Sequence, residues 1–161
     1  MDESQLRAQI DAVAAFPDAL KQQLQGVSDD ALRFRPAPDA WSIVELVGHI
    51  SDVGALWPGR TRQMLASENP ALAAVDANWV RQRDYQNKQL NFLLISLAEQ
   101  RAEYVEFLRI LRPAQLARAG IHPTRGPITV AEGIAALADH DRGHSEQIAA
   151  NLEAFERGSR G

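Results

Sequence analysis

The chain has 161 residues, of which 45% are hydrophobic and 24% are charged, as is typical of one soluble globular domain with its own core. Its net charge of −4 at pH 7 and its scattered arginines argue against nucleic acid as a partner. It contains no cysteine, which excludes disulfides, a cysteine-ligated zinc site and a cysteine nucleophile.

The sequence carries no sign of export or of membrane insertion. The N-terminal segment MDESQLRAQI is polar and acidic, unlike a signal peptide, and no apolar run approaches the ~20 residues that span a bilayer. We therefore expect a cytoplasmic protein without a membrane partner. We expect a single domain over residues 1–161, with residues 3–156 ordered and residues 157–161 as a frayed tail.

The first predicted helix runs from about Glu3 to Gly26. Pro17 lacks a backbone donor and crowds the preceding turn, so we expect a kink or a restart there. Gly26 is a typical C-terminal stop, and a loop with two prolines follows. The inward face carries apolar residues at helical spacing: Leu6, Ile10, Val13, Leu20 and Leu24.

The second predicted helix, from Ser42 to about Leu65, has the strongest start signal in the chain. Ser42 and Glu45 form a capping box, in which each side chain satisfies a backbone amide left free at the helix start. Trp41 precedes the box and is placed to act as a hydrophobic staple. His49 lies beside the apolar stripe of this helix, which comprises Ile43, Leu46, Val47, Ile50, Val53 and Trp57.

The third predicted helix follows the connection Ser67–Ala77, in which Asp76 is a candidate cap. Its leucines recur at helical spacing until Pro113, which ends the helix. We expect a polar loop from Ala114 to Ile128, which contains His122, because no strand-like alternation of polar and apolar residues is found.

The fourth predicted helix opens on a second capping box, Thr129 with Glu132, and carries His140 and His144 at the border of its apolar face. Four amphipathic helices in one chain predict an all-α fold, a four-helix bundle.

The histidines are the clearest chemical signal. His140 and His144 are four residues apart, so both imidazoles lie on one helical face, one turn apart. Helix packing in a bundle can bring His49 to the same place, and three histidines with an open position are typical of a reactive metal site. Alternatively, each is only a hydrogen-bonded boundary residue. The motif His-Asp-Arg-Gly-His resembles that of zinc proteases only in spacing, because aspartate replaces the glutamate general base.

Two aspartates and the remaining histidine have more than one interpretation. Asp141 points near the centre of the apolar stripe, where a charge is costly unless it is paired. It either orients a metal-ligating imidazole or forms a structural link to an arginine or a backbone amide. Asp52, beside His49, is a candidate to accept a proton or hold a bound water. His122 is a candidate fourth ligand, an acid/base group at the mouth of the site, or a loop residue.

Two stretches resemble the DinB/YfiT-like superfamily. The first is RPAPDAWSIVELVGHISD, residues 35–52. The second is the pattern His122-Pro123, Gly126, Thr129, then His140-Asp141-x-x-His144-x-x-Gln147-Ile148. The resemblance extends from the first helix to Leu152. It implies a four-helix bundle with a long crossover between helices two and three, for which the Ser67–Ala77 connection is long enough.

The resemblance also implies a divalent metal, nickel or zinc, held by three histidines that match His49, His140 and His144. Members similar in fold include thiol-dependent enzymes, namely mycothiol-dependent maleylpyruvate isomerase and bacillithiol transferases, and others resemble metal-dependent hydrolases. The resemblance further implies a homodimer formed through helix faces. The absence of cysteine in the chain is compatible with a low-molecular-weight thiol co-substrate.

The leading hypothesis is therefore a metal-dependent enzyme that acts on a small molecule. A metal held by neutral imidazoles lowers the pKa of water or of a thiol and gives a nucleophile near neutral pH. Transfer of a low-molecular-weight thiol to an electrophile and hydrolysis are the two expected outcomes. The alternative is a non-catalytic binding module whose histidines are structural or bind metal without turnover, because helical bundles host both roles.

Overall fold

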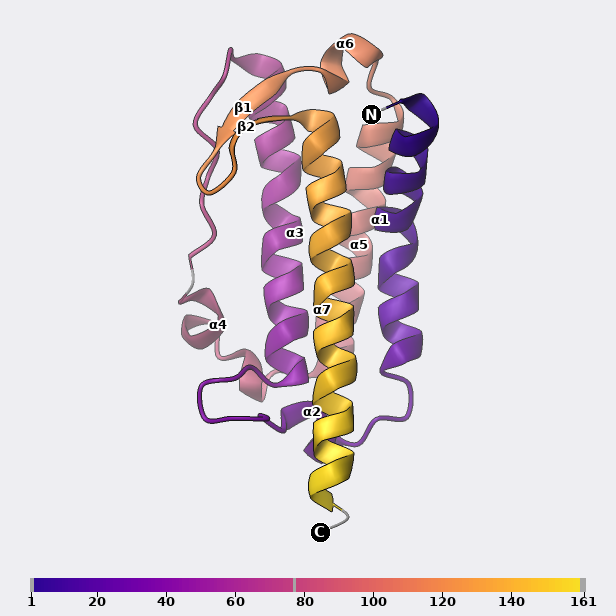
Figure 1. The fold of residues 1–161 in the computed structure, drawn as a ribbon, viewed down its shortest axis with the longest axis vertical. Helices are drawn as coiled ribbons and strands as arrows, with labels where there is room; N and C mark the ends of the chain where they lie inside the picture. Colours follow the sequence, from indigo (N-terminus) through magenta and orange to yellow (C-terminus); the bar gives the residue numbers. More distant parts are fainter. Residues whose placement is uncertain (1, 77, 160–161) are drawn as a thin grey trace.

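Four long helices make up the bundle in the structure, a computed structural model that describes residues 2–76 and 78–159 (Figure 1). They are α1 (Glu3–Gln23), α3 (Ile43–Ala66), α5 (Leu90–Arg109) and α7 (Val130–Ser159). The connections contain α2 (Asp29–Arg33), α4 (Trp79–Gln82), the 3-10 turn η1 (Tyr85–Asn87), α6 (Pro113–Leu116) and the strands β1 (Ala119–His122) and β2 (Gly126–Thr129). The predicted four-helix bundle is confirmed.

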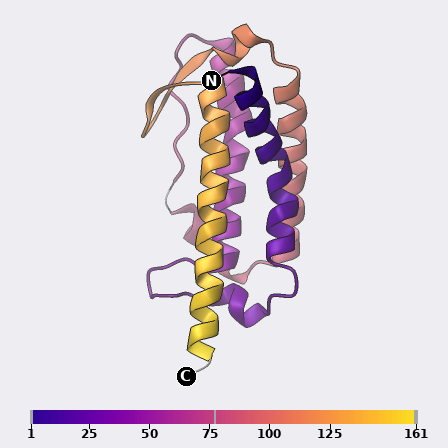
Figure 2. The same cartoon turned by 45° about the vertical axis from the view of Figure 1, so that its right-hand side comes forward.

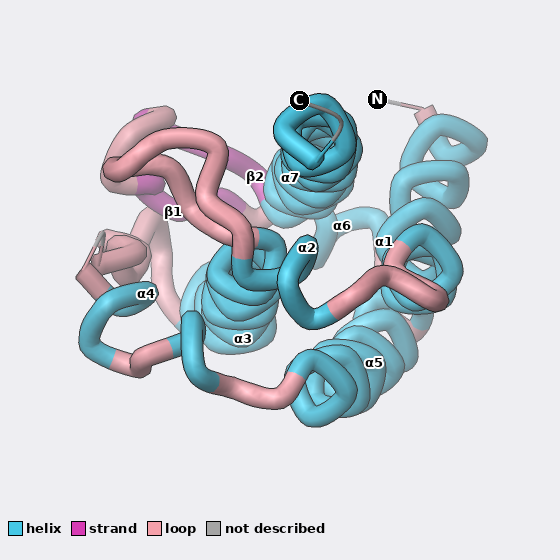
Figure 3. Tube along the Cα trace, turned by 90° about the horizontal axis from the view of Figure 1, so that it is seen from below, coloured by secondary structure: helices cyan, strands magenta, loops and turns pink. Residues whose placement is uncertain are grey.

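The helix directions require an unusual connection. α1 and α7 run one way along the bundle, whereas α3 and α5 run the other way (Figures 1 and 2). Both α1 and α3 pack against α5 and α7, and the four helices form a ring when viewed along the bundle in Figure 3. Because α3 and α5 are parallel neighbours, residues 67–76 and 78–89 return along the outside of α3. The predicted long crossover is confirmed, but it extends beyond Ala77, which lies outside the described residues.

The third long helix begins later than predicted. Asp76 accepts a hydrogen bond from the Asn78 N–H (2.8 Å). The helix that follows this bond is the four-residue α4 and not the predicted long helix. Asp84 follows with a φ of +51°, a left-handed conformation that interrupts a right-handed helix. The prediction of one long helix after Asp76 is therefore wrong. Pro113 begins α6 and does not end α5, which stops at Arg109.

Pro17 lies inside a continuous helix. α1 runs from Glu3 to Gln23 without a break, so the restart expected at Pro17 does not occur. Pro17 itself is buried between Val13 and Leu20 on the core face of α1. Packing of this face against the bundle outweighs the loss of one backbone hydrogen bond.

Both predicted capping boxes are present. Ser42 Oγ accepts from the Glu45 N–H (3.3 Å), and Glu45 Oε2 accepts from the Ser42 N–H (2.9 Å). At the start of α7, Glu132 Oε2 accepts from the Thr129 N–H (2.8 Å), and Thr129 Oγ1 accepts from the Glu132 N–H (3.1 Å). These local signals fix where α3 and α7 begin.

Two glycines allow close packing on α3. The ring of Tyr85, from the crossover, lies directly against Gly48, where an added Cβ would collide with it. The ring of Trp57 on α3 occupies the space left by Gly133 on α7 in the same way. These contacts bring the crossover and α7 closer to α3 than side chains would allow.

An antiparallel hairpin, residues 119–129, stands where a polar loop was predicted. It is joined to the crossover, because Leu72 donates its N–H to the Ile121 carbonyl (2.9 Å) and Ile121 donates to the Pro70 carbonyl (2.8 Å). Strands of this length are too short to show a recognisable alternation in sequence, and a distant segment completes the pairing. The prediction of a loop without strands is corrected accordingly.

The last helix is longer than expected. α7 continues to Ser159, although a frayed tail was predicted from Arg157. Residues 160–161 lie outside the described residues. None of the helices in the described part of the chain is long and apolar enough to cross a membrane.

The cap of α3 provides a first test. Ser42 is fully buried, and its hydroxyl also donates to Gln86 Oε1 (2.6 Å). Ser42→Ala leaves the Glu45 N–H unpaired, so we expect it to lower the free energy of unfolding by about 1–2 kcal/mol in urea denaturation. Ser28→Ala is the control, because Ser28 is itself exposed and caps only the five-residue α2, and it should cost less than ~0.5 kcal/mol. Equal losses would contradict the prediction.

Candidate metal centre

Three imidazoles meet where α3 packs against α7. His49 lies on α3, and His140 and His144 lie one turn apart on α7. The Nε2 atoms of His49 and His140 are 3.2 Å apart, and one nitrogen from each ring lies within 4.8 Å of the others. All three side chains are half-buried. The structure thus brings together the three residues that the sequence pattern singled out.

The spacing and chemistry of this group fit a divalent metal ion. Two nitrogens bound to a tetrahedral zinc at about 2.0–2.1 Å lie ~3.3 Å apart. The His49–His140 separation of 3.2 Å is close to this value. Three imidazoles leave a tetrahedral ion one open position, as in catalytic sites. Imidazole is a good ligand for both nickel and zinc, so the donor set is compatible with either metal.

Burial favours the neutral form of two candidate ligands, His49 and His144. Loss of hydration, followed by the proximity of His140 and His144, lowers the pKa of His49 from its ordinary value of 6.5 to about 4. The pKa of His144 is also lowered, mainly by burial. Metals bind the neutral form of imidazole, so neither ring has to lose a proton to bind at neutral pH.

Two of the three rings, those of His140 and His144, have an acceptor for Nδ1 on α7. His144 Nδ1 lies 3.0 Å from Gln147 Oε1, and His140 Nδ1 lies 3.5 Å from Asp141 Oδ1. An acceptor at Nδ1 places the ring proton there and leaves Nε2 free for a metal. The only sequence signal for this role of Gln147 is its position three residues after His144, on the same helical face.

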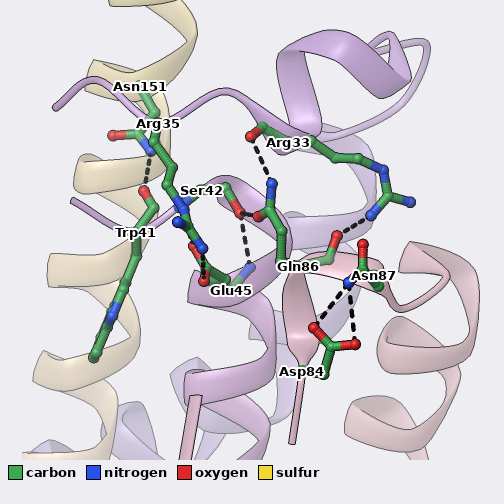
Figure 4. A network of polar contacts seen from close by, with 9 residues as sticks. All are labelled: Arg33, Arg35, Trp41, Ser42, Glu45, Asp84, Gln86, Asn87 and Asn151. Atoms are coloured by element: carbon green, nitrogen blue, oxygen red, sulfur yellow. Dashed lines mark hydrogen bonds and ion pairs between the residues drawn. The ribbon is translucent and has the colours of Figure 1, made fainter. Parts of the chain in front are cut away.

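The ring of Trp41 packs against the imidazole of His49. The centroids of the Trp41 and His49 rings are 4.8 Å apart. Buried Asn151 on α7 donates from Nδ2 to the Trp41 carbonyl (2.9 Å), as Figure 4 shows. This bond ties the residue that precedes the α3 cap to α7, about two turns beyond His144. Trp41 therefore belongs to the site as well as to the start of the helix.

A polar network holds the start of α3 in place (Figure 4). Arg35 binds both carboxylate oxygens of Glu45, through Nε (2.9 Å) and Nη2 (2.5 Å). Gln86 of the crossover accepts from the Ser42 hydroxyl and donates to the Arg33 carbonyl (3.0 Å). The network joins α2, the α3 cap and the crossover, and it leaves Glu45 with a structural role.

Asp52 contacts the crossover and is not one of the grouped ligands. Its carboxylate is buried, accepts a hydrogen bond from the Tyr85 hydroxyl (2.8 Å) and pairs with Arg83. Burial raises the pKa of Asp52, whereas Tyr85 and Arg83 act in the opposite direction. Its role as a proton acceptor stays a prediction.

His122 lies on the hairpin, outside the three-imidazole group. Its ring stacks on Trp57, with centroids 6.1 Å apart and planes 18° apart. Burial, followed by the nearby Arg60 and Arg125, lowers the pKa of His122. A role at the mouth of the site stays a prediction.

The sequence model of the DinB superfamily matches residues 12–148, most of the chain, including all three histidines. The chain belongs to the DinB superfamily. Its curated relatives include two proteins of Oceanobacillus iheyensis, each named "putative metal-dependent hydrolase", which are 23% identical over 140 residues and 26% identical over 137 residues. These alignments cover 86% and 84% of this chain, and 81% and 79% of the relatives.

YfiT of Bacillus subtilis bears the same description and is 25% identical over 141 residues, which cover 86% of this DinB-superfamily chain and 79% of YfiT. The solved structure of YfiT matches with a TM-score of 0.90 at 23% identity, over 97% of this chain and 90% of the YfiT chain. YfiT is described as having an unusual four-helix bundle topology. The likeness shows a shared fold. The homodimer and the small-molecule substrate stay predictions.

The metal-free protein should lose stability as the pH falls from about 6.5 toward 4. His49 takes up a proton near pH 6.5 in the unfolded chain but only at about 4 when folded, so the unfolded chain binds more protons in this window. Stability is fully present above this window and is lost within it. Because the ring is partly exposed, we expect only ~1 kcal/mol from His49 at about pH 5.

Urea denaturation with a chelator at about pH 7 and about pH 5 measures this contribution. His49→Gln, which does not titrate, is the matched variant. It should lose less stability on acidification than the wild-type protein, and an equal loss in the two proteins would contradict the prediction.

Proposed function

We propose that this chain is a metal-dependent hydrolase that acts on a small molecule, with nickel or zinc held by His49, His140 and His144. The convergence of three imidazoles within 4.8 Å is the observation that carries the proposal. Membership of a family whose curated relatives bear hydrolase names supports it. A divalent ion with an open position acts as a Lewis acid and lowers the pKa of bound water, which supplies a nucleophile near neutral pH.

The protein's own residues orient the ligands and shape access to them. Gln147 fixes the ring of His144, and the Trp41 ring covers one side of His49. The half-buried state of all three imidazoles leaves another side open to solvent. We expect a small molecule to reach the site from that side.

Thiol transfer is the other reaction that the same centre would support. The chain has no cysteine, so the thiol must come from a low-molecular-weight co-substrate. Dependence of turnover on an added thiol therefore separates transfer from hydrolysis. A bundle that holds metal without turnover would correspond to the non-catalytic binding module.

Metal content is the first measurement. We expect untagged protein to carry about one divalent metal per chain by elemental mass spectrometry, and His49→Ala, His140→Ala and His144→Ala each to lose it. His122→Ala is the matched control and should keep the metal, because His122 lies outside the group. Wild-type protein that stays metal-free after incubation with zinc and nickel would favour the binding module.

Turnover on a panel of esters, amides and thioesters, with and without a thiol, is the second measurement. We propose that Asp52 serves in proton transfer and that His122 lines the mouth of the site. Asp52→Asn and His122→Ala should then reduce turnover by at least ~10-fold while the metal content is unchanged. Unchanged turnover would remove both residues from the mechanism.

A further inference from the structure

We propose that the buried ion pair between Asp141 on α7 and Arg101 on α5 positions His140 for metal binding. Asp141 directly follows His140 in the chain, but its side chain lies in the core of the bundle, with 2% of its surface exposed. The inference rests on the metal site of the proposed function and not on the reaction that occurs there.

The pair itself is incompletely satisfied. Arg101 Nη2 donates to Asp141 Oδ1 (2.8 Å), and both side chains are 2% exposed. The guanidinium lies against Gly54, where an added Cβ would be 3.2 Å from Nη2. Arg101 Nε and Nη1 and Asp141 Oδ2 are buried without a hydrogen-bond partner. A buried pair with such unsatisfied atoms stabilises a fold little better than well-packed apolar residues would.

The ion pair is in contact with His140 through Asp141. Nε2 of His140 faces Nε2 of His49, so a metal ligand at this position carries its ring proton on Nδ1. Asp141 Oδ1 lies 3.5 Å from that Nδ1 and is its acceptor. A carboxylate at the remote nitrogen fixes the orientation of the ring and raises its basicity as a ligand. Arg101 in turn holds Asp141 in place.

The two candidate ligands on α7 therefore have different hydrogen-bond acceptors. His144 has a neutral amide acceptor, Gln147, at 3.0 Å, whereas His140 has a charged one. Asp141 and Arg101 act through His140 and are positioning residues, not ligands.

Zinc affinity, measured by competition with a chromophoric chelator, tests the proposal. Asp141→Asn keeps the shape of the side chain and should weaken zinc binding ~10–100-fold. Asp139→Asn is the matched control: Asp139 directly precedes His140, is exposed and pairs with Arg142 (3.0 Å). Removal of this solvent-screened charge should change the affinity by less than ~2-fold.

The double variant Arg101→Met/Asp141→Leu separates positioning from folding. It removes both charges and leaves neither buried alone, so the metal-free protein should stay folded by circular dichroism. Its zinc affinity should still fall at least ~10-fold, and the absorption spectrum of its cobalt form should differ from that of the wild-type protein. If zinc affinity and the cobalt spectrum were unchanged in both variants, the inference would be overturned, but the proposed function would still stand. Failure of the wild-type protein to bind zinc or nickel would overturn the proposed function together with it.

Discussion

The axial register between α3 and α7 is the constraint on which the candidate site depends. These antiparallel helices are fixed on both sides of the imidazoles: Asn151 bonds to the Trp41 carbonyl on one side, and Trp57 fills the space at Gly133 on the other. A shift of one residue would move a side chain by about 1.5 Å along the axis and turn it by about 100°, enough to separate the rings. The network around Ser42 and Glu45 also ties α3 to the crossover, so the register is set by buried contacts outside the histidines themselves.

The parts of the fold that could be predicted are those determined by neighbouring residues. The capping boxes at Ser42 and Thr129 fix the start of α3 and α7 within a few residues, and apolar periodicity reveals four long helices. The crossover and the hairpin could not be predicted in detail, because distant contacts determine them. Tyr85 is placed by Gly48, and the hairpin strand pairs with residues 70–72. Pro17 was misleading because core packing keeps α1 intact around it.

The candidate site shows the same division. Helical spacing was sufficient to pair His140 with His144, and the packing of α3 against α7 brings His49 to them. Spacing alone could not reveal the partner of Asp141, because Arg101 lies 40 residues away on α5. The same limitation applies to Asp52: its position three residues after His49 suggested a common task, but Tyr85 and Arg83 draw its carboxylate toward the crossover. A helix places such neighbours on one flank without making their side chains converge.

Gly48 and His49 are consecutive residues, and their contacts lie on different sides of α3. The ring of Tyr85 occupies the surface at Gly48, while the imidazole of His49 projects toward α7. Rotation of α3 about its own axis in one direction would press backbone or a neighbouring side chain into that ring, so the crossover acts as a steric stop. The orientation of a candidate metal ligand thereby depends in part on a segment that supplies no ligand, and a change in the crossover can alter the imidazole group without touching it.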